Sequence, residues 1–244
     1  MKKFAIITGA SRGIGYAVAE YFAAHDYDLA LIARDPHRLD AAKQQLVHTY
    51  PQCEITTLAL DVAQAQMTYA KVRDLVQARG QVDVLFNNAG IAMGGCDDVS
   101  VEDFAQLMAV NANGLFAVAK AVAEVMKQQR RGYIFNVSSI AGKRAYSFVG
   151  AYGASKYAVT GFSEALCKTL APYGVKVTAL CPGAIATDMT KNMAMPNEVK
   201  IQVEDIVTTV DYLLALSPNA VIPSIDIECN AMIVAENADM TLPD

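Results

Sequence analysis

Residues 4–22 read FAIITGASRGIGYAVAEYF, an apolar run followed by a glycine-rich turn and then by a stretch with helical periodicity. This order predicts a buried strand, a tight turn and a helix, which is the context that a dinucleotide site requires. We expect Gly9 to permit the turn, Gly13 to let the backbone approach a pyrophosphate, and Gly15 to let the helix pack closely on the strand. The helix N-terminus would offer unpaired N–H groups to the phosphates. A glycine-rich turn without a ligand is the alternative interpretation.

Composition indicates a globular protein of one domain. The chain has 244 residues, of which 53% are hydrophobic and 18% charged, so it can bury a large core and is too apolar for disorder. A net charge of −5 argues against nucleic-acid binding, which needs a basic face. No apolar run approaches the about 18 residues of a membrane span, and the first three residues lead directly into a strand. We therefore predict a soluble, cytoplasmic protein.

The cysteines give no sign of a disulfide framework or a metal site. They are five in number, scattered, and without C-x-x-C spacing. We expect buried, reduced thiols and no bound metal, with disulfides or a metal site as the alternative. These cysteines are Cys53, Cys96, Cys167, Cys181 and Cys229.

Strand and helix patterns alternate along the rest of the chain. Further strands are predicted at residues 28–33, 54–60, 82–86, 132–137, 175–180 and 224–229, with a helix over residues 36–50 between the first two. Ser100 to Asp103 resembles a capping box that opens a long helix towards Gln128. Such alternation is typical of an α/β fold with a mostly parallel sheet and helices on both faces. Ligands of such sheets bind at the carboxyl ends of the strands.

A tyrosine, a lysine and a serine form the main catalytic hypothesis. Tyr152 and Lys156 are four residues apart, about one helical turn, so both side chains project from one helix face. A phenol has an unperturbed pKa of about 10, and a neighbouring ammonium is expected to lower the pKa of Tyr152 towards neutrality. Ser139, thirteen residues before the tyrosine, would bond a substrate oxygen. A Y-x-x-x-K pair by itself often only decorates a helix surface.

The motifs together resemble the short-chain dehydrogenase/reductase family. They are T-G-x-x-x-G-x-G at residues 8–15, then Asn87-Asn88-Ala89-Gly90, Asn111, Ser139, Tyr152, Lys156 and Pro182-Gly183, in that order. The resemblance covers nearly the whole chain. It implies one NAD(P)-binding domain over residues 1–244 with a Rossmann-type, doubly wound parallel sheet of about seven strands. It also implies hydride transfer between a nicotinamide cofactor and a carbonyl or alcohol.

The resemblance assigns four catalytic residues. Ser139 and Tyr152 would hold the carbonyl oxygen, with Tyr152 as general acid or base. Lys156 would lower the pKa of the tyrosine and bond the ribose of the nicotinamide. Asn111 would bend its helix and hold a water that relays protons to the lysine. From the residues alone, Asn111 is an unpromising helix former that could instead bond a neighbouring backbone group.

Further cofactor contacts carry over by position. Asp61 and Val62 would touch the adenine, and the residues after Asn87 would line the adenine ribose. The backbone N–H of Ile185 and the hydroxyl of Thr187 would hold the nicotinamide carboxamide. The full predicted set is Gly9, Ser11, Arg12, Gly13, Ile14, Gly15, Arg34, Asp61, Val62, Asn88, Ala89, Gly90, Tyr152, Lys156, Pro182, Gly183, Ile185 and Thr187.

Two arginines favour NADP(H) over NAD(H). An NAD site usually has an acid at the end of the second strand, where this chain has Ala33 followed by Arg34. Arg12 in the glycine turn and Arg34 would form charge-assisted bonds to a 2′-phosphate. Asp35 is interpreted as a surface residue or a helix N-cap. The alternative is that both arginines are merely solvated.

The resemblance thus implies NADPH-dependent reduction of a ketone or aldehyde to an alcohol, or the reverse. The alternatives are a catalytically silent NADP(H)-binding sensor or scaffold, and an epimerase or dehydratase, which the length of the chain disfavours. A methionine-rich loop, about residues 184–203, is expected to cover a small-molecule substrate that the sequence does not identify. Lys143 and Arg144 could attract an anionic substrate or could form a solvated charge pair.

The C-terminus departs from the family pattern. Many members end in a V-D-G-G-type run beside the last strand, whereas this chain has Ile225 to Met232 and then a polar tail. The departure weakens an assignment as a ketoacyl reductase. It also puts the usual homotetramer in doubt, because the missing segment often helps to form one interface, so a homodimer or a homotetramer is expected.

Overall fold

A computed structural model describes residues 2–237, and it contains one seven-stranded sheet with all strands parallel. The strands are β1 (Lys3–Thr8), β2 (Tyr27–Ala33), β3 (Ile55–Ala59), β4 (Val84–Asn87), β5 (Gly132–Val137), β6 (Val175–Pro182) and β7 (Ser224–Ile227). Their order in space is β3-β2-β1-β4-β5-β6-β7, so the winding direction reverses between β1 and β4. This reversal creates a crevice at the carboxyl ends of the strands, as in a Rossmann-type fold. The predicted fold class is confirmed.

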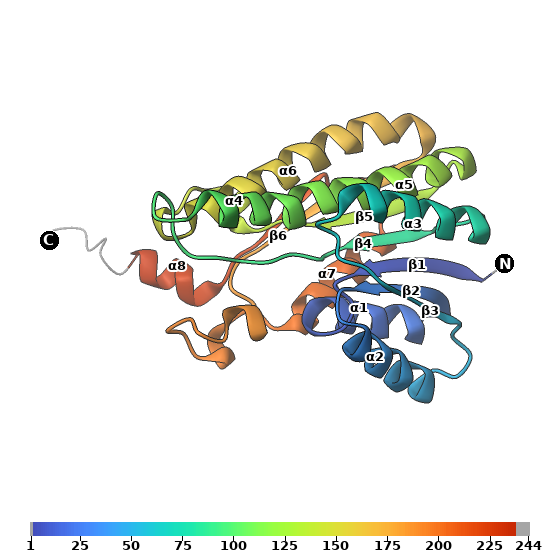
Figure 1. Ribbon diagram of the computed structural model, residues 1–244, viewed down its shortest axis with the longest axis horizontal. Coiled ribbons are helices and arrows are strands. Elements are labelled where there is room, and N and C mark those ends of the chain that lie inside the picture. Colours follow the sequence, from blue (N-terminus) through green and yellow to red (C-terminus); the bar gives the residue numbers. More distant parts are fainter. Residues whose placement is uncertain (1, 238–244) are drawn as a thin grey trace, which may run out of the picture.

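Helices cover both faces of the sheet (Figure 1). They are α1 (Gly13–Ala24), α2 (Pro36–Thr49), α3 (Ala65–Arg79), α4 (Val101–Met108), α5 (Leu115–Gln129), α6 (Gly150–Leu170), α7 (Val203–Ala215) and α8 (Asn230–Asn237). Side chains of α1, α2 and α7 share one buried apolar cluster, and those of α3, α5 and α6 share another. Because successive strand residues point to opposite faces, Ala5 and Ile7 join the first cluster while Phe4 and Ile6 join the second. The sheet therefore lies between two apolar cores.

Local signals in the sequence position the helix starts. Ser100 accepts a hydrogen bond from the N–H of Asp103 at 3.0 Å and donates to its carboxylate at 2.8 Å, which confirms the predicted cap. Asp35 caps α2 by accepting from the N–H groups of His37 and Arg38 at 3.0 and 3.1 Å. The same two bonds, Arg38 first, lower the pKa of the Asp35 carboxyl. Asp35 is therefore an N-cap, as the sequence suggested.

The long helix predicted after Ser100 is interrupted. Between α4 and α5 the chain forms a π-helix over Ala109–Gly114, which contains Asn111. The last predicted strand is also shorter than expected, because β7 ends at Ile227 and α8 begins at Asn230. The final part of the predicted polar tail, residues 238–244, lies outside the described residues.

The cysteines and the helices bear on two further expectations. All five thiols are unpaired, and four of them are buried, whereas Cys96 is exposed and contradicts the expectation for that residue. Within residues 2–237 no group of His, Cys, Asp and Glu has the arrangement of a metal site. Over the same residues, no helix combines the length and the apolar character that crossing a membrane requires.

Candidate active site

The glycine turn after β1 is built by two close approaches. Gly9 has φ of 66°, a conformation that side-chain-bearing residues rarely adopt. A Cβ on Gly15 would lie 2.3 Å from the carbonyl oxygen of Gly9, so only glycine lets α1 start this close to the turn. The close approach at Gly15 is therefore to the turn that follows β1 rather than to the strand itself. Asn88 completes the turn from β4, because its amide donates to the Thr8 carbonyl at 3.1 Å.

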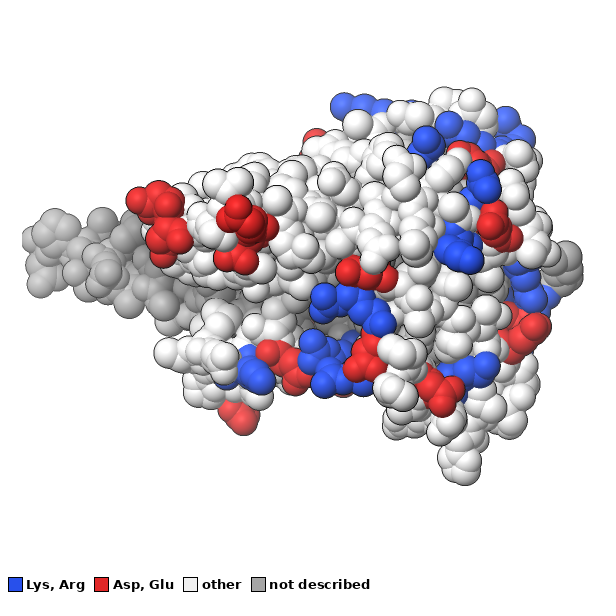
Figure 2. All heavy atoms as spheres, in the orientation of Figure 1, with Lys and Arg blue, Asp and Glu red and all other residues white. Residues whose placement is uncertain are grey.

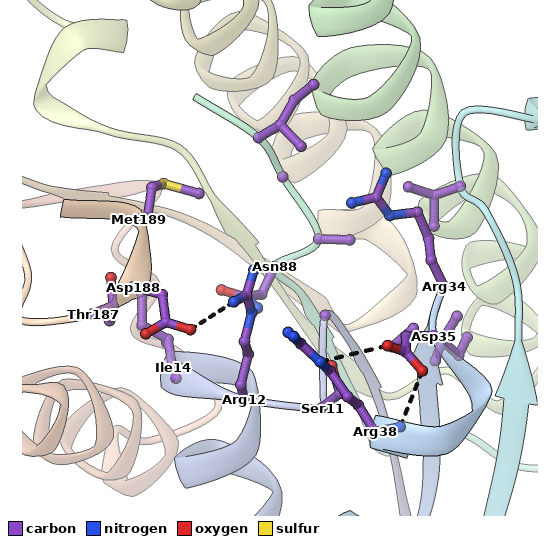
Figure 3. A pocket seen from close by; sticks show the side chains of 18 of the residues that line it. Ser11, Arg12, Ile14, Arg34, Asp35, Arg38, Asn88, Thr187, Asp188 and Met189 are labelled. Atoms are coloured by element: carbon purple, nitrogen blue, oxygen red, sulfur yellow. Dashed lines mark hydrogen bonds and ion pairs between the residues drawn. The ribbon is translucent and has the colours of Figure 1, made fainter. Parts of the chain in front are cut away.

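A cavity of about 580 Å³ opens beside this turn and is here called the glycine-turn cavity. Its wall includes many of the predicted cofactor residues, namely Gly9, Ser11, Arg12, Gly13, Ile14, Arg34, Val62, Asn88, Ala89, Gly90 and Thr187. Figure 3 shows side chains of this wall around the cavity. The wall does not include the other predicted residues Gly15, Asp61, Pro182, Gly183, Ile185, Tyr152 and Lys156.

Three arginines line the glycine-turn cavity. Arg12 is paired with Asp188 at 2.5 Å, and Arg38 with Asp35 at 3.4 Å, while Arg34 rises from the end of β2 (Figure 3). Figure 2 shows basic and acidic side chains gathered around a hollow in the centre of this face. Arg38 was missed in the sequence, although its place in the first turn of the helix after β2 was a usable signal. The cavity wall thus carries three guanidinium groups, and those of Arg12 and Arg38 are already paired with carboxylates.

The predicted residues outside that wall have structural partners. The carboxylate of Asp61 accepts from the N–H of Ala63 at 3.1 Å. Pro182 ends β6, and its carbonyl accepts from the Ser139 hydroxyl at 3.3 Å. Gly183 donates its N–H to the Ile227 carbonyl at 2.9 Å, and Ile185 is buried in a short bridge with Ile201.

Ser139, Tyr152 and Lys156 come together at the start of α6. Ser139 follows β5, and its side chain lies close enough to Tyr152 to lower the pKa of the phenol. The ammonium of Lys156 lies 5.6 Å from the centroid of the Tyr152 ring and donates to the Val137 carbonyl at 2.9 Å. The helical spacing therefore places both side chains on one face, as expected. The neighbouring Ser138 instead donates to the Lys156 carbonyl at 3.0 Å and bonds the Thr160 hydroxyl at 2.8 Å.

The predicted lowering of the tyrosine pKa is wrong for this structure. Burial raises the pKa of Tyr152 to about 12, and the hydrogen bond from Ser139 offsets only part of that rise. Burial also lowers the pKa of Lys156 to about 8, since desolvation disfavours its charged form. Desolvation is therefore the dominant effect on both groups, and the expected attraction between phenolate and ammonium does not outweigh it.

Asn111 is buried in the π-helix and all of its polar atoms have partners. Its carbonyl oxygen accepts from the Ile91 N–H, and its amide donates to the Ile91 carbonyl and to the Ser155 hydroxyl, each at 2.9 Å. The alternative of bonding to a neighbouring backbone group is thus what the structure shows. A Cβ on Gly90 would lie 3.3 Å from the Asn111 oxygen and 3.6 Å from the Lys156 ammonium. Gly90 and Ile91 also line the glycine-turn cavity, so they connect it to Asn111 and Lys156.

The cations near Ser139 are paired within the chain. Arg144 bonds the Glu228 carboxylate at 2.6 and 3.3 Å, and Lys143 lies 3.9 Å from Asp226 and 4.0 Å from Glu164. The structure therefore bears out the charge-pair alternative for these two residues. In the predicted substrate loop, residues 184–203, the side chains of Met189 and Met193 are exposed rather than buried in the core.

Comparisons with known protein sequences point to a single family. A family model described as short chain dehydrogenase matches residues 3–198. The oxidoreductase BOA17 of Botryotinia fuckeliana is 36% identical over 189 residues, which are 77% of this chain and 68% of that protein. The 3-oxoacyl-[acyl-carrier-protein] reductase FabG of Chlamydia muridarum is 33% identical over 195 residues, 80% of this chain and 78% of that protein.

Solved structures agree with the sequence matches. A β-ketoacyl-[ACP] reductase, FabG, from Bacteroides thetaiotaomicron has a TM-score of 0.84 at 37% identity and covers 96% of this chain and 99% of its own. ElxO with NADP bound has a TM-score of 0.85 at 26% identity, over 96% of this chain and 100% of its own. The protein described here therefore belongs to the short-chain dehydrogenase family of oxidoreductases.

Proposed function

We propose that the protein is an NADPH-dependent oxidoreductase that reduces a ketone or aldehyde to an alcohol, or catalyses the reverse reaction. The observation that carries this proposal is the continuity between the catalytic group and the glycine-turn cavity. Gly90 lies against Asn111 and Lys156 on one side and lines the cavity on the other. A catalytically silent sensor has no comparable support, because Asn111, Ser139, Tyr152 and Lys156 are all present.

The glycine-turn cavity fits a dinucleotide phosphate in shape and charge. Gly9 and Gly13 both have positive φ, which leaves backbone without side chains beside the start of α1, where an anion is stabilised by the helix dipole. Arg12, Arg34 and Arg38 would hold a 2′-phosphate. The complexes of ElxO with NADP and of the Thermococcus sibiricus alcohol dehydrogenase with 5-hydroxy-NADP support the choice.

The other contacts proposed for the cofactor follow from position. Val62 and Asn88 to Gly90 would hold the adenine and its ribose, with Asp61 close by. Ile185 and Thr187, after Pro182-Gly183, would hold the carboxamide. The nicotinamide, when bound, supplies or accepts the hydride.

Proton transfer would be the task of Tyr152. Its raised pKa keeps the phenol protonated at neutral pH, which suits a donor to the developing alkoxide. Ser139 would stabilise the same oxygen with a second hydrogen bond. Lys156 would bond ribose hydroxyls and favour the phenolate after transfer, and Asn111 would hold the water that returns a proton to the lysine.

The substrate is proposed to be a small, uncharged carbonyl compound. Lys143 and Arg144, which follow Ser139 in the sequence, are engaged by carboxylates of this chain. An anionic substrate would have to displace these carboxylates. We also propose one domain, a substrate loop at about residues 184–203, a homodimer or homotetramer, and a cytoplasmic location.

The test is NADPH oxidation against a panel of ketones, aldehydes and quinones, repeated with NADH. Tyr152→Phe should reduce kcat by about 10²- to 10⁴-fold, since it removes the general acid. The affinity for NADPH should stay nearly unchanged. Tyr157→Phe is the matched control, because Tyr157 lies on the same helix and is 46% exposed. Full activity of Tyr152→Phe, or loss of NADPH binding in that variant, would refute the assignment.

A further inference from the structure

One lysine of the segment between β6 and α7 is buried without an acidic partner. Lys200 is 5% exposed, and its ammonium donates to the Thr190 carbonyl at 2.8 Å and to the Asn197 side-chain oxygen at 3.0 Å. Both acceptors are neutral, and no carboxylate of residues 2–237 forms a salt bridge with it. Burying a cation is costly unless it is well bonded, so this placement calls for a specific use.

The bonds of Lys200 lead to the residues proposed for the nicotinamide. The Thr190 hydroxyl donates to the Ile185 carbonyl, and the Thr190 N–H donates to the Thr187 carbonyl at 3.1 Å. A single residue thus separates the ammonium of Lys200 from Ile185 and Thr187. A shift of Thr190 would therefore displace both Ile185 and Thr187, because it is bonded to the carbonyl groups of both.

The backbone next to Lys200 is joined to the same place. Ile201 donates its N–H to the Ala184 carbonyl at 3.0 Å and accepts from the N–H of Ala186 at 2.9 Å. The Gln202 side chain, at the start of α7, donates to the Lys200 carbonyl at 2.8 Å. The segment therefore leaves the sheet after β6, and its end at Ile201 pairs with its beginning at Ala184 and Ala186 before α7 starts. It is drawn in orange in Figure 1.

We propose that Lys200 is a positioning residue of the active site, which fixes Thr190 and through it the orientation of Ile185 and Thr187. This inference rests on the proposed function, because it takes those two residues as the carboxamide site. The ammonium does not touch the reacting atoms in this proposal. It closes the base of the loop so that the site is formed before the cofactor arrives.

The test compares Lys200→Met with Lys200→Arg and with Lys191→Met. Lys191 is an exposed lysine of the same segment and has no role in the proposal, so its variant controls for loss of charge. Lys200→Met should raise the KM for NADPH about tenfold or more and lower kcat. Lys200→Arg should restore part of both, and Lys191→Met should behave as the wild type. The melting temperature should change little with Lys200→Met, because the loss of two hydrogen bonds opposes the gain from removing a buried charge.

Amide hydrogen exchange gives a readout that does not depend on activity. In Lys200→Met the amides of residues 185–190 should exchange at least tenfold faster, while those of β1 keep their wild-type protection. Unchanged exchange and unchanged KM would overturn the proposal. A lower melting temperature with kcat reduced and KM unchanged would also overturn it, since the role would then be structural alone. If wild-type protein binds neither NADPH nor NADH, the proposed function fails, and the exchange result still decides whether Lys200 holds the loop.

Discussion

Arg12 and Asp188 form an ion pair across the glycine-turn cavity, with Nη1 and Oδ2 2.5 Å apart. Arg12 belongs to the turn after β1, and Asp188 follows Thr187 beyond β6, so the pair joins the two halves of the sheet. The sequence predicted that Arg12 would meet a 2′-phosphate. In the structure its guanidinium is already engaged by a carboxylate of the opposite wall (Figure 3). An incoming phosphate must therefore compete with Asp188 for Arg12.

Replacing the carboxylate should strengthen cofactor binding. Both side chains are more than half exposed, and such a pair is worth about 0–1 kcal/mol, so Asp188→Asn should lower the Kd for NADPH by up to about fivefold. NADPH fluorescence titration at low ionic strength measures this, and the chain contains no tryptophan to interfere. The gain should be absent with NADH if Arg12 contacts the 2′-phosphate. Weaker NADPH binding in Asp188→Asn would contradict competition.

Burial of Lys156 should make the protein less stable below pH 8 than a variant without that charge. The folded-state pKa falls from 10.5 to about 8, so the unfolded chain holds more protons between these values. The penalty is complete below pH 8, shrinks as the pH rises, and vanishes above pH 10.5. Lys156→Met should thus be more stable than the wild type at pH 7, by up to about 3 kcal/mol, and should be inactive.

Urea denaturation of both proteins at pH 7 and at pH 10.5 checks this sign. The loss of the bond to the Val137 carbonyl affects Lys156→Met at both pH values and therefore leaves the difference between them intact. A stability difference that does not shrink at the higher pH would show that desolvation of Lys156 is not its cause.

The Asn111 amide should be needed as a donor. Asn111→Asp keeps the shape but replaces two N–H bonds, to the Ile91 carbonyl and to Ser155, with a carboxylate oxygen that cannot donate. We expect a loss of about 2–3 kcal/mol in the free energy of unfolding, together with a lower kcat. Asn113→Asp is the control, because Asn113 is exposed in the same π-helix. Equal effects at the two positions would mean that added charge, rather than lost bonds, is responsible.

The sequence was most informative where local chemistry decides the structure. Apolar runs located the seven strands, and Asp35 and Ser100 marked the starts of two helices, because capping depends on residues within one turn. The glycine turn was also predictable, since close backbone approach at Gly15 excludes any side chain.

The features that were missed depend on distant parts of the chain. Arg12 and Asp188 are 176 residues apart, and nothing near either residue indicates the other. The pKa of Tyr152 follows from how deeply the fold buries it, which the Y-x-x-x-K spacing does not encode. The π-helix contains Asn111, whose side chain bonds Ile91, a residue of the loop after β4 that is distant in the sequence.

The glycine turn allows a last prediction with an internal control. Gly15→Ala would place a Cβ 2.3 Å from the Gly9 carbonyl oxygen, a backbone atom that cannot move without opening the turn. We expect a loss of about 1–3 kcal/mol in unfolding free energy and weaker binding of NADPH. Gly161→Ala changes a helical glycine with nothing within 4 Å of the added Cβ, so it should gain about 1 kcal/mol. Urea denaturation of both variants measures the contrast, and a neutral Gly15→Ala would mean that α1 can shift away from the turn at no cost.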